Sequence, residues 1–90
     1  MQPKLSKKEK MVLIALGEVF KELRCENAMS QRMLAFEYGL HKSLISRFES
    51  SSNNPFFLNV WKIAETVDIR PSEFIALVEK KLPNGFKLID

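Results

Sequence analysis

Five polar residues between positions 42 and 50 have the side-chain types and spacing needed to read another molecule. At helical periodicity they share one face, opposite the apolar residues of the same stretch: Lys42, Ser43, Ser46, Arg47 and Ser50. Lys and Arg can donate hydrogen bonds to guanine O6 and N7, and Ser can donate or accept. No acid interrupts this face, and serine is too small to hold a base edge at a distance. The pattern favours insertion into a DNA major groove; the alternative, open to any single basic helix, is a solvated surface.

Two short apolar runs on either side of Gly39 would position this face. The first run contains Met33, Leu34, Ala35 and Tyr38, and the second contains Leu44, Ile45 and Phe48. Gly39 can adopt a positive φ without steric cost, so the backbone can reverse within about three or four residues. The sequence therefore predicts a helix over 31–38, a tight turn and a second helix over 42–50.

This arrangement resembles the helix-turn-helix of the lambda repressor and Cro family, also called the Xre type. In that pattern a Gln opens the first helix, a small residue follows four positions later, and a Gly follows four positions after that. Apolar residues then occupy the recognition helix. The matching positions here are Gln31, Ala35, Gly39, Leu40, Ile45 and Phe48. The similarity runs from about Leu16 to about Leu77, and it implies DNA binding through the second of the two helices.

The resemblance also implies roles for individual residues. Base contacts carry over to Lys42, Ser43 and Arg47, whereas Ser46 and Ser50 fit phosphate or neighbouring contacts. Further backbone contacts are predicted from the start of the first helix and from the two loops, which gives the full set of candidate DNA-binding residues: Gln31, His41, Lys42, Ser43, Ser46, Arg47, Ser50, Asn53 and Asn54.

Four of these candidates also have a purely structural interpretation. Gln31 would lie at a helix N-terminus, where it could contact a phosphate, brace a recognition-helix side chain, or simply tolerate exposure. His41 precedes the second helix and could contact a phosphate, but a lone His beside a turn is more often a cap or a solvated residue. Asn53 and Asn54 could follow the DNA backbone or serve only as turn formers, and either could supply the positive φ where the family commonly has the Gly that Ser51 replaces.

Arg24 and Glu49 occupy places that are often paired in the resembled family. Such an ion pair would fix the pose of the recognition helix on the core. If the pair is partly buried, removing one partner costs about 3 to 5 kcal/mol. If both groups are exposed, the pair contributes only about 0 to 1 kcal/mol.

The length and composition exclude several classes of protein. Ninety residues are enough for one helical core but not for a separate ligand-sensing domain. Fourteen Lys and Arg against eleven Asp and Glu give a net charge of +3, which permits nucleic-acid binding without proving it. Cys25 is the single cysteine, so no intramolecular disulfide is expected and a cytoplasmic location is consistent. We find no catalytic constellation, metal-ligand spacing or phosphate-binding loop, and expect no enzyme activity, no cofactor and no membrane contact.

The rest of the chain predicts an all-α, five-helix, lambda-repressor-like fold in one domain. Ser6 and Glu9 form a capping box that starts a helix over about 7–26. Further helices are predicted over about 57–67 and, from Pro71, to about Leu82. The inward face of the fourth helix is predicted to include Phe57, with the preceding Phe56 tucked against the protein. We divide the chain into an extension at 1–15, a core at 16–82 and a tail at 83–90 that could form a short strand.

The run from Met11 to Ala15 is apolar around more than one helix face. Either a second subunit or the C-terminal tail could cover this surplus, and the sequence does not decide between them. A wide apolar stripe on the last helix offers a further surface for pairing.

Two hypotheses of function follow. The first is a sequence-specific transcriptional regulator, a repressor that binds a palindromic operator as a homodimer. A single reader with about two or three base contacts, each contributing about 1 to 3 kcal/mol, cannot select one site in a genome. The second is an antitoxin that binds a toxin protein and regulates its own operon through the same DNA-binding fold.

Overall fold

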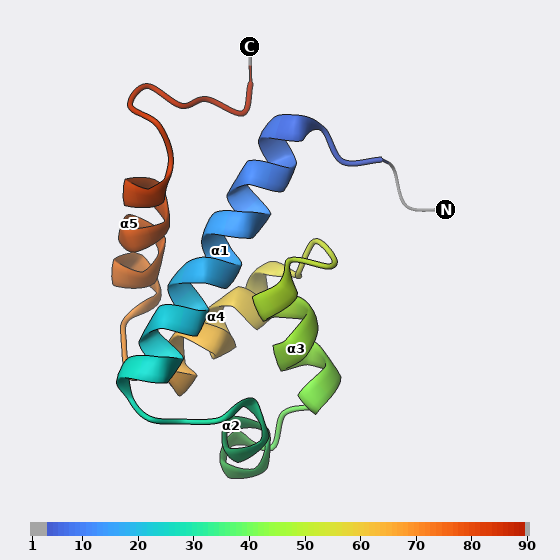
Figure 1. Cartoon of the computed structure of the whole chain (residues 1–90), viewed down its shortest axis with the longest axis vertical. Helices are drawn as coiled ribbons and strands as arrows, with labels where there is room; N and C mark the ends of the chain where they lie inside the picture. The colour runs from blue at the N-terminus through green and yellow to red at the C-terminus, as the bar shows by residue number, and fades with distance from the viewer. Residues whose placement is uncertain (1–3, 90) are drawn as a thin grey trace.

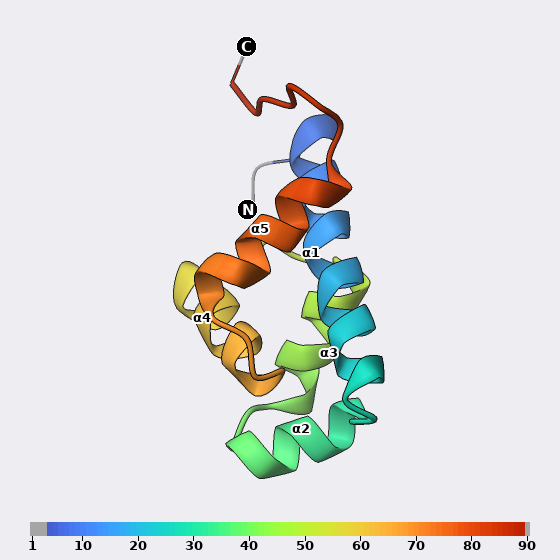
Figure 2. The same cartoon turned by 90° about the vertical axis from the view of Figure 1, so that its left-hand side faces the viewer.

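The computed structural model describes residues 4–89, and these form five helices and no strand. The helices are α1 (Lys7–Glu26), α2 (Gln31–Tyr38), α3 (Lys42–Ser50), α4 (Phe57–Thr66) and α5 (Pro71–Lys81). The long α1 runs diagonally across the molecule, with α5 along one side and α3 along the other (Figure 1). Turned by 90°, α2 lies at the bottom, α1 and α3 at the right, α4 at the left and α5 in the upper middle (Figure 2). The predicted all-α, five-helix fold is confirmed.

Local capping explains why the first two helices begin where the sequence predicts. Ser6 Oγ accepts a hydrogen bond from the Glu9 amide, and the Glu9 carboxylate accepts one from the Ser6 amide, which completes the capping box. Ser30 caps α2 in the same way through the Met33 amide. Gly39 ends α2 with a φ of 65°, the left-handed conformation that the tight turn requires.

The core lies between α1 on one side and α3, α4 and α5 on the other. Its largest fully buried side chains come from all five helices: Phe20, Phe74, Leu34, Ile45, Ile63 and Val19. Phe48 of α3 packs between two of these rings, with centroids 5.6 Å from Phe20 and 6.2 Å from Phe74. The apolar side of α3 is thereby anchored on α1 and α5, and its polar side is left outside.

Gly17 allows α1 and α3 to approach closely. A Cβ atom at this position would lie 2.5 Å from the backbone oxygen of Glu49 and 3.1 Å from that of Phe48. One turn before Gly17 on α1, the carbonyl oxygen of Leu13 accepts a hydrogen bond of 2.8 Å from Ser51 Oγ. The end of α3 is therefore held directly against the first half of α1.

Most of the apolar run at the start of α1 is covered within the chain. Leu13 and Ala15 are buried and Val12 is partly buried, because α1 packs against α3 on one side and α5 on the other. Leu82, just after α5, packs against the same core. Only Ile14 of the run remains half-exposed, so this segment has little surface left for a second subunit.

Three local predictions are wrong. Phe57 and Phe56 were expected to face or pack against the protein, yet their side chains are 70% and 82% exposed, because α4 turns Val60, Ile63 and Ala64 toward the core instead. The positive φ after α3 belongs to Ser51, at 60°, and not to Asn53 or Asn54.

The strand considered for the tail does not form in the described residues 83–89, where the chain makes a turn at Gly85 and has no strand to pair with. The tail prediction at Asp90 lies outside the described residues. Among residues 4–89, no helix is both long enough and apolar enough to cross a bilayer.

Candidate nucleic-acid interface

The outer face of α3 is open and polar. Lys42, Ser43, Arg47 and Ser50 are exposed, and Ser46 is half-buried on the side nearer α1. Within the described residues, no ion pair engages Lys42 or Arg47. The cationic side chains are therefore available to an external anion or base edge.

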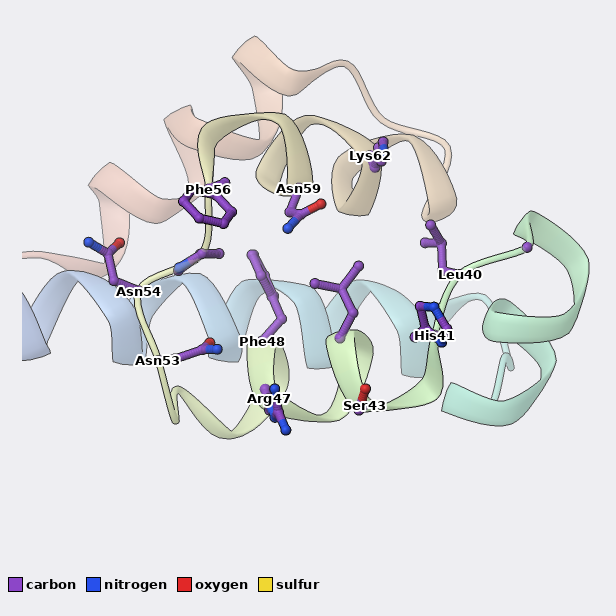
Figure 3. Close-up of a pocket in the computed structure, with 13 residues that line it drawn as sticks. Leu40, His41, Ser43, Arg47, Phe48, Asn53, Asn54, Phe56, Asn59 and Lys62 are labelled. Atoms are coloured by element: carbon purple, nitrogen blue, oxygen red, sulfur yellow. The ribbon is translucent and has the colours of Figure 1, made fainter. Parts of the chain in front are cut away.

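A hollow of about 490 Å³ lies between α3, the loop after it and the start of α4. Figure 3 shows Arg47 and Ser43 along its α3 edge, and Asn53 and Asn54 in the loop. His41 lies at its other end, where it forms the N-cap of α3 with no side-chain hydrogen bond to the helix. The hollow thus brings five of the nine candidate residues together.

The other four candidates lie elsewhere on the same side. Lys42, Ser46 and Ser50 belong to α3 but do not line the hollow. Ser50 Oγ shares a hydrogen bond with Ser52 Oγ and lies 3.4 Å from the carbonyl oxygen of Arg47. Gln31 is half-buried in the first turn of α2, where its side chain helps to lower the pKa of the Glu49 carboxyl.

Two residues of α4 belong to this surface and were not among the predicted candidates. Asn59 and Lys62 face α3 across the hollow, beside the exposed ring of Phe56 (Figure 3). Their spacing of three places both on one side of α4. The sequence signal was the pair of polar residues interrupting an apolar helix, but the orientation of α4 toward α3 depends on tertiary packing.

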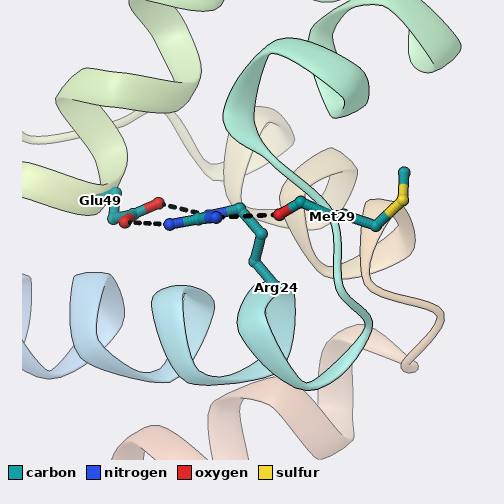
Figure 4. A network of polar contacts seen from close by, with 3 residues as sticks. All are labelled: Arg24, Met29 and Glu49. Atoms are coloured by element: carbon teal, nitrogen blue, oxygen red, sulfur yellow. Dashed lines mark hydrogen bonds and ion pairs between the residues drawn. The ribbon is translucent and has the colours of Figure 1, made fainter.

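An ion pair connects α1 to the end of α3. Arg24 Nη2 lies 2.7 Å from Glu49 Oε1, and Arg24 Nε donates a second hydrogen bond of 2.9 Å to Glu49 Oε2 (Figure 4). Arg24 Nη1 also donates to the carbonyl oxygen of Met29, at 2.9 Å, in the loop between α1 and α2. One guanidinium therefore fixes the end of α3 and the approach to α2 at the same time.

The two groups are largely shielded from solvent, with side-chain exposures of 14% for Arg24 and 9% for Glu49. Burial alone would raise the pKa of the Glu49 carboxyl, but hydrogen bonds from Arg24 and Gln31 and the positive charges of Arg24 and Lys21 outweigh it and lower that pKa. The hydrogen bond to Glu49 raises the pKa of Arg24. The pair is thus fully ionised at neutral pH.

Residues 20–74 match the family model described as helix-turn-helix, which covers more than half of the chain. The chain belongs to the helix-turn-helix family. The resemblance to lambda repressor-like, Xre-type proteins is confirmed, and so is the assignment as a DNA-binding regulator of that family. The matched residues contain α2, α3 and α4 in full, so the hollow and the outer face of α3 lie inside the family domain.

Two relatives of this helix-turn-helix chain are named as a control protein and a controller protein. The chain is 29% identical to the control protein C.BamHI of Bacillus amyloliquefaciens over 65 residues, which cover 71% of this chain and 80% of that protein. The crystal structure of the restriction-modification controller protein C.AhdI of Aeromonas hydrophila is 35% identical, with a TM-score of 0.63, and covers 69% of this chain and 94% of that one.

A third comparison supports the fold alone. A single-residue variant of the restriction-modification controller protein C.Esp1396I has a TM-score of 0.72 at 24% identity, covering 83% of this chain and 95% of that one. In both structural comparisons nearly all of the relative is matched while part of this chain is not. This helix-turn-helix chain therefore has segments beyond the domain it shares with them.

Proposed function

We propose that the chain is a sequence-specific transcriptional repressor that binds a palindromic operator as a homodimer. The exposed, unpaired Arg47 on the outer face of α3, beside Ser43 and the polar hollow, carries this proposal. One relative is named a control protein, and another is named a restriction-modification controller protein, which supports a role in regulating the genes of such a system. We also propose that the regulator acts in the cytoplasm, where its operator would lie. The antitoxin alternative has no comparable support.

The proposed reading chemistry follows from which groups α3 presents. Arg47 can donate a bidentate pair of hydrogen bonds to guanine O6 and N7, and Lys42 and Ser43 can contact neighbouring bases. Asn53, Asn54, Asn59 and the N-terminus of α2 at Gln31 lie around this face and suit phosphates, which fix the register. The Arg24–Glu49 pair positions the reader and does not itself contact DNA.

This reading role is tested by selecting bound sites from random DNA at a stated salt concentration. We expect a two-fold symmetric site with half-sites roughly 34 to 36 Å apart. Arg47→Ala should cost about 1 to 3 kcal/mol and relax discrimination at one base step. Lys80→Ala, which removes an exposed cation on α5, is the matched control and should leave discrimination unchanged. Unaltered discrimination by Arg47→Ala would remove this residue from base reading.

The surface for homodimerisation is the apolar face shared by α4 and α5. Phe57 and Trp61, one turn apart on α4, pack edge to face with ring centroids 6.1 Å apart, and Ile75 of α5 is also exposed. Together with Val60 and Pro71 they line a hollow of about 720 Å³ whose surface is mostly apolar. An apolar patch of this kind on a small protein marks an interaction site.

A second copy of the chain fits this face because the charges around it are mixed. Glu65 and Arg70 lie on the rim of the same hollow. In a two-fold interface each residue of one subunit can face its complement in the other, so this rim can pair with itself. The face does not include the outer side of α3, so both recognition helices would remain free to bind DNA.

The dimer proposal is tested by sedimentation of Phe57→Glu combined with Ile75→Glu. Both side chains are exposed, so the variant should fold and be monomeric, with loss of cooperative binding to a full operator. Phe36→Glu is the control, since Phe36 is 92% exposed on α2, away from this face. A Phe57→Glu, Ile75→Glu variant that stays dimeric would place the interface elsewhere.

A further inference from the structure

The surplus positive charge of the protein is concentrated at its N-terminal end. The chain has fourteen Lys and Arg and eleven Asp and Glu, and its first ten residues contain four lysines and one glutamate. The remaining eighty residues thus carry ten basic and ten acidic side chains and are neutral in sum. The net positive charge, which would attract nucleic acid, therefore lies almost entirely in the segment before the helix-turn-helix.

The structure places this segment beside the C-terminal end of α3. The hydrogen bond from Ser51 Oγ to the Leu13 carbonyl and the close contact at Gly17 hold the first half of α1 against the end of α3. The chain before α1 leaves the helix on the side where α3 and the loop after it lie (Figure 1). The segment that carries these lysines thus begins beside the C-terminal end of the proposed interface.

Lys10 lies beside the edge of α1 that faces α3, because it is three residues before Leu13 and seven before Gly17. Lys7 is in the first turn of α1, on the adjoining solvent-exposed side of the helix. Both are exposed, as is Lys4, and residues 4–89 contain no ion pair with any of the three. Lys8 lies on a different side of the helix and has an interaction of its own.

Among the described residues, Lys81 pairs with Glu18 and Glu22, and Arg70 pairs with Glu73. Within the same part of the chain, Lys7 and Lys10 share their lack of an ion pair with Lys42 and Arg47 on the outer face of α3. Lys7 and Lys10 are also poorly placed for the stability of α1, because positive charge near a helix N-terminus opposes the helix dipole. The stability of α1 therefore does not account for these two cations at its start.

We propose that Lys7 and Lys10, together with Lys4, bind DNA phosphates just outside the half-site read by α3, beyond the C-terminal end of that helix. The proposal rests on the proposed DNA-binding function and extends its footprint. Lys7 and Lys10 precede residue 20, where the match to the family model begins, so this contact is additional to the family domain. It adds affinity that depends on salt and not on the flanking sequence.

The salt dependence of binding to a selected operator tests the proposal. Each phosphate contact contributes about 0.9 to the slope of log affinity against log salt concentration. In a two-fold dimer, Lys10→Gln should make the slope shallower by about 1.8, and Lys7→Gln with Lys10→Gln by about 3.6. Lys80→Gln, with the same charge change on α5, should leave the slope unchanged.

DNA length supplies an independent arm. Extending each end of the operator fragment by about half a helical turn, roughly 5 base pairs, should tighten binding by the native protein but not by the Lys7→Gln, Lys10→Gln variant. Discrimination between operator and point-changed sites should be the same for both proteins. The melting temperature of the variant should be equal to or above that of the native protein, since removing these charges relieves the helix dipole.

The outcomes separate the two proposals. If the native protein selects an operator but the double variant keeps the native slope and the native gain from flanking DNA, the lysine contact is wrong and the reader remains. If the native protein selects no site from random DNA, the proposed function fails and the lysine contact fails with it. A slope reduced equally by Lys10→Gln and Lys80→Gln would show a general charge effect and would also overturn the contact.

Discussion

Replacing Arg24 with methionine should strongly destabilise this protein, although the residue lies outside the proposed reading surface. Arg24→Met keeps much of the aliphatic side chain and removes three hydrogen bonds, two to Glu49 and one to the Met29 carbonyl. It also leaves the Glu49 carboxylate, only 9% exposed, without its main partner. The perturbation therefore isolates an uncompensated charge between α1 and α3.

The size of the effect follows from the burial. Breaking a buried ion pair by removing one partner costs about 3 to 5 kcal/mol, whereas an exposed pair contributes about 0 to 1 kcal/mol. Exposures of 14% and 9% put this pair near the buried limit, and its remaining solvent contact favours the lower end, about 3 kcal/mol. For a domain of this size, that corresponds to a fall in melting temperature of roughly 12 to 24 °C.

A second variant separates charge burial from lost contacts. Arg24→Met combined with Glu49→Leu removes both charges, and apolar replacement of a buried pair is often close to neutral. The double variant should recover most of the loss and keep a deficit of about 1 kcal/mol, because the Met29 carbonyl still lacks its donor. Glu49→Leu alone should be less damaging than Arg24→Met, since Arg24 keeps the bond to Met29 and can reach solvent.

The pH dependence of stability tests the same ion pair by changing the protonation of Glu49. The folded-state pKa of Glu49 is below its ordinary value of 4.5, so the contribution of the pair is fully present above about pH 4.5 and is lost as the pH falls through the folded pKa. In Arg24→Met the isolated carboxylate is relieved by protonation. The difference in unfolding free energy between native protein and variant should therefore be largest at neutral pH and shrink as the pH falls toward and below about 4.5.

The measurement is urea and thermal unfolding followed by far-UV circular dichroism, at one fixed protein concentration because dimerisation would couple to stability. A loss below about 1 kcal/mol at neutral pH, or a deficit that does not change with pH, would show that solvent screens the pair. In that case the argument that Arg24 fixes the pose of α3 would fail.

Three further substitutions test the packing around the reader. Gly17→Ala should destabilise the protein by up to about 2 kcal/mol and weaken operator binding. The added methyl would lie 2.5 Å from the Glu49 backbone oxygen, and this overpacking outweighs the gain of about 1 kcal/mol in helix propensity. A variant as stable as the native protein would contradict the close approach of the two helices. Ala28 has a φ of 54°, so Ala28→Gly should stabilise the protein by up to about 1 kcal/mol. The melting temperature should rise by a few degrees, and a fall in melting temperature would exclude backbone strain at residue 28. Phe48→Ala should cost about 3 to 5 kcal/mol in urea unfolding, since its ring packs between aromatic rings of α1 and α5 and is 3% exposed; a smaller loss would mean that the site collapses around the cavity.

The sequence by itself determined the helices and their order. Ser6, Ser30 and Gly39 are local signals whose effect extends over only a few residues, so the boundaries of α1, α2 and α3 followed from them without knowledge of the fold. The periodicity of 42–50 likewise separated the polar face of α3 from Ile45 and Phe48, which are buried. Hydrophobic spacing within one helix is enough to decide this, because one side must meet the core.

Only the tertiary structure decided how the helices face one another. An apolar residue such as Phe57 fits either the core or an exposed face, and the choice depends on how α4 is rotated against α3 and α5. The close contact at Gly17, the joining of Asn59 and Lys62 to the surface of Arg47, and the position of the N-terminal lysines beside the end of α3 all depend on residues distant in sequence. Such contacts leave no local periodic signal, because they are set by the packing of whole helices.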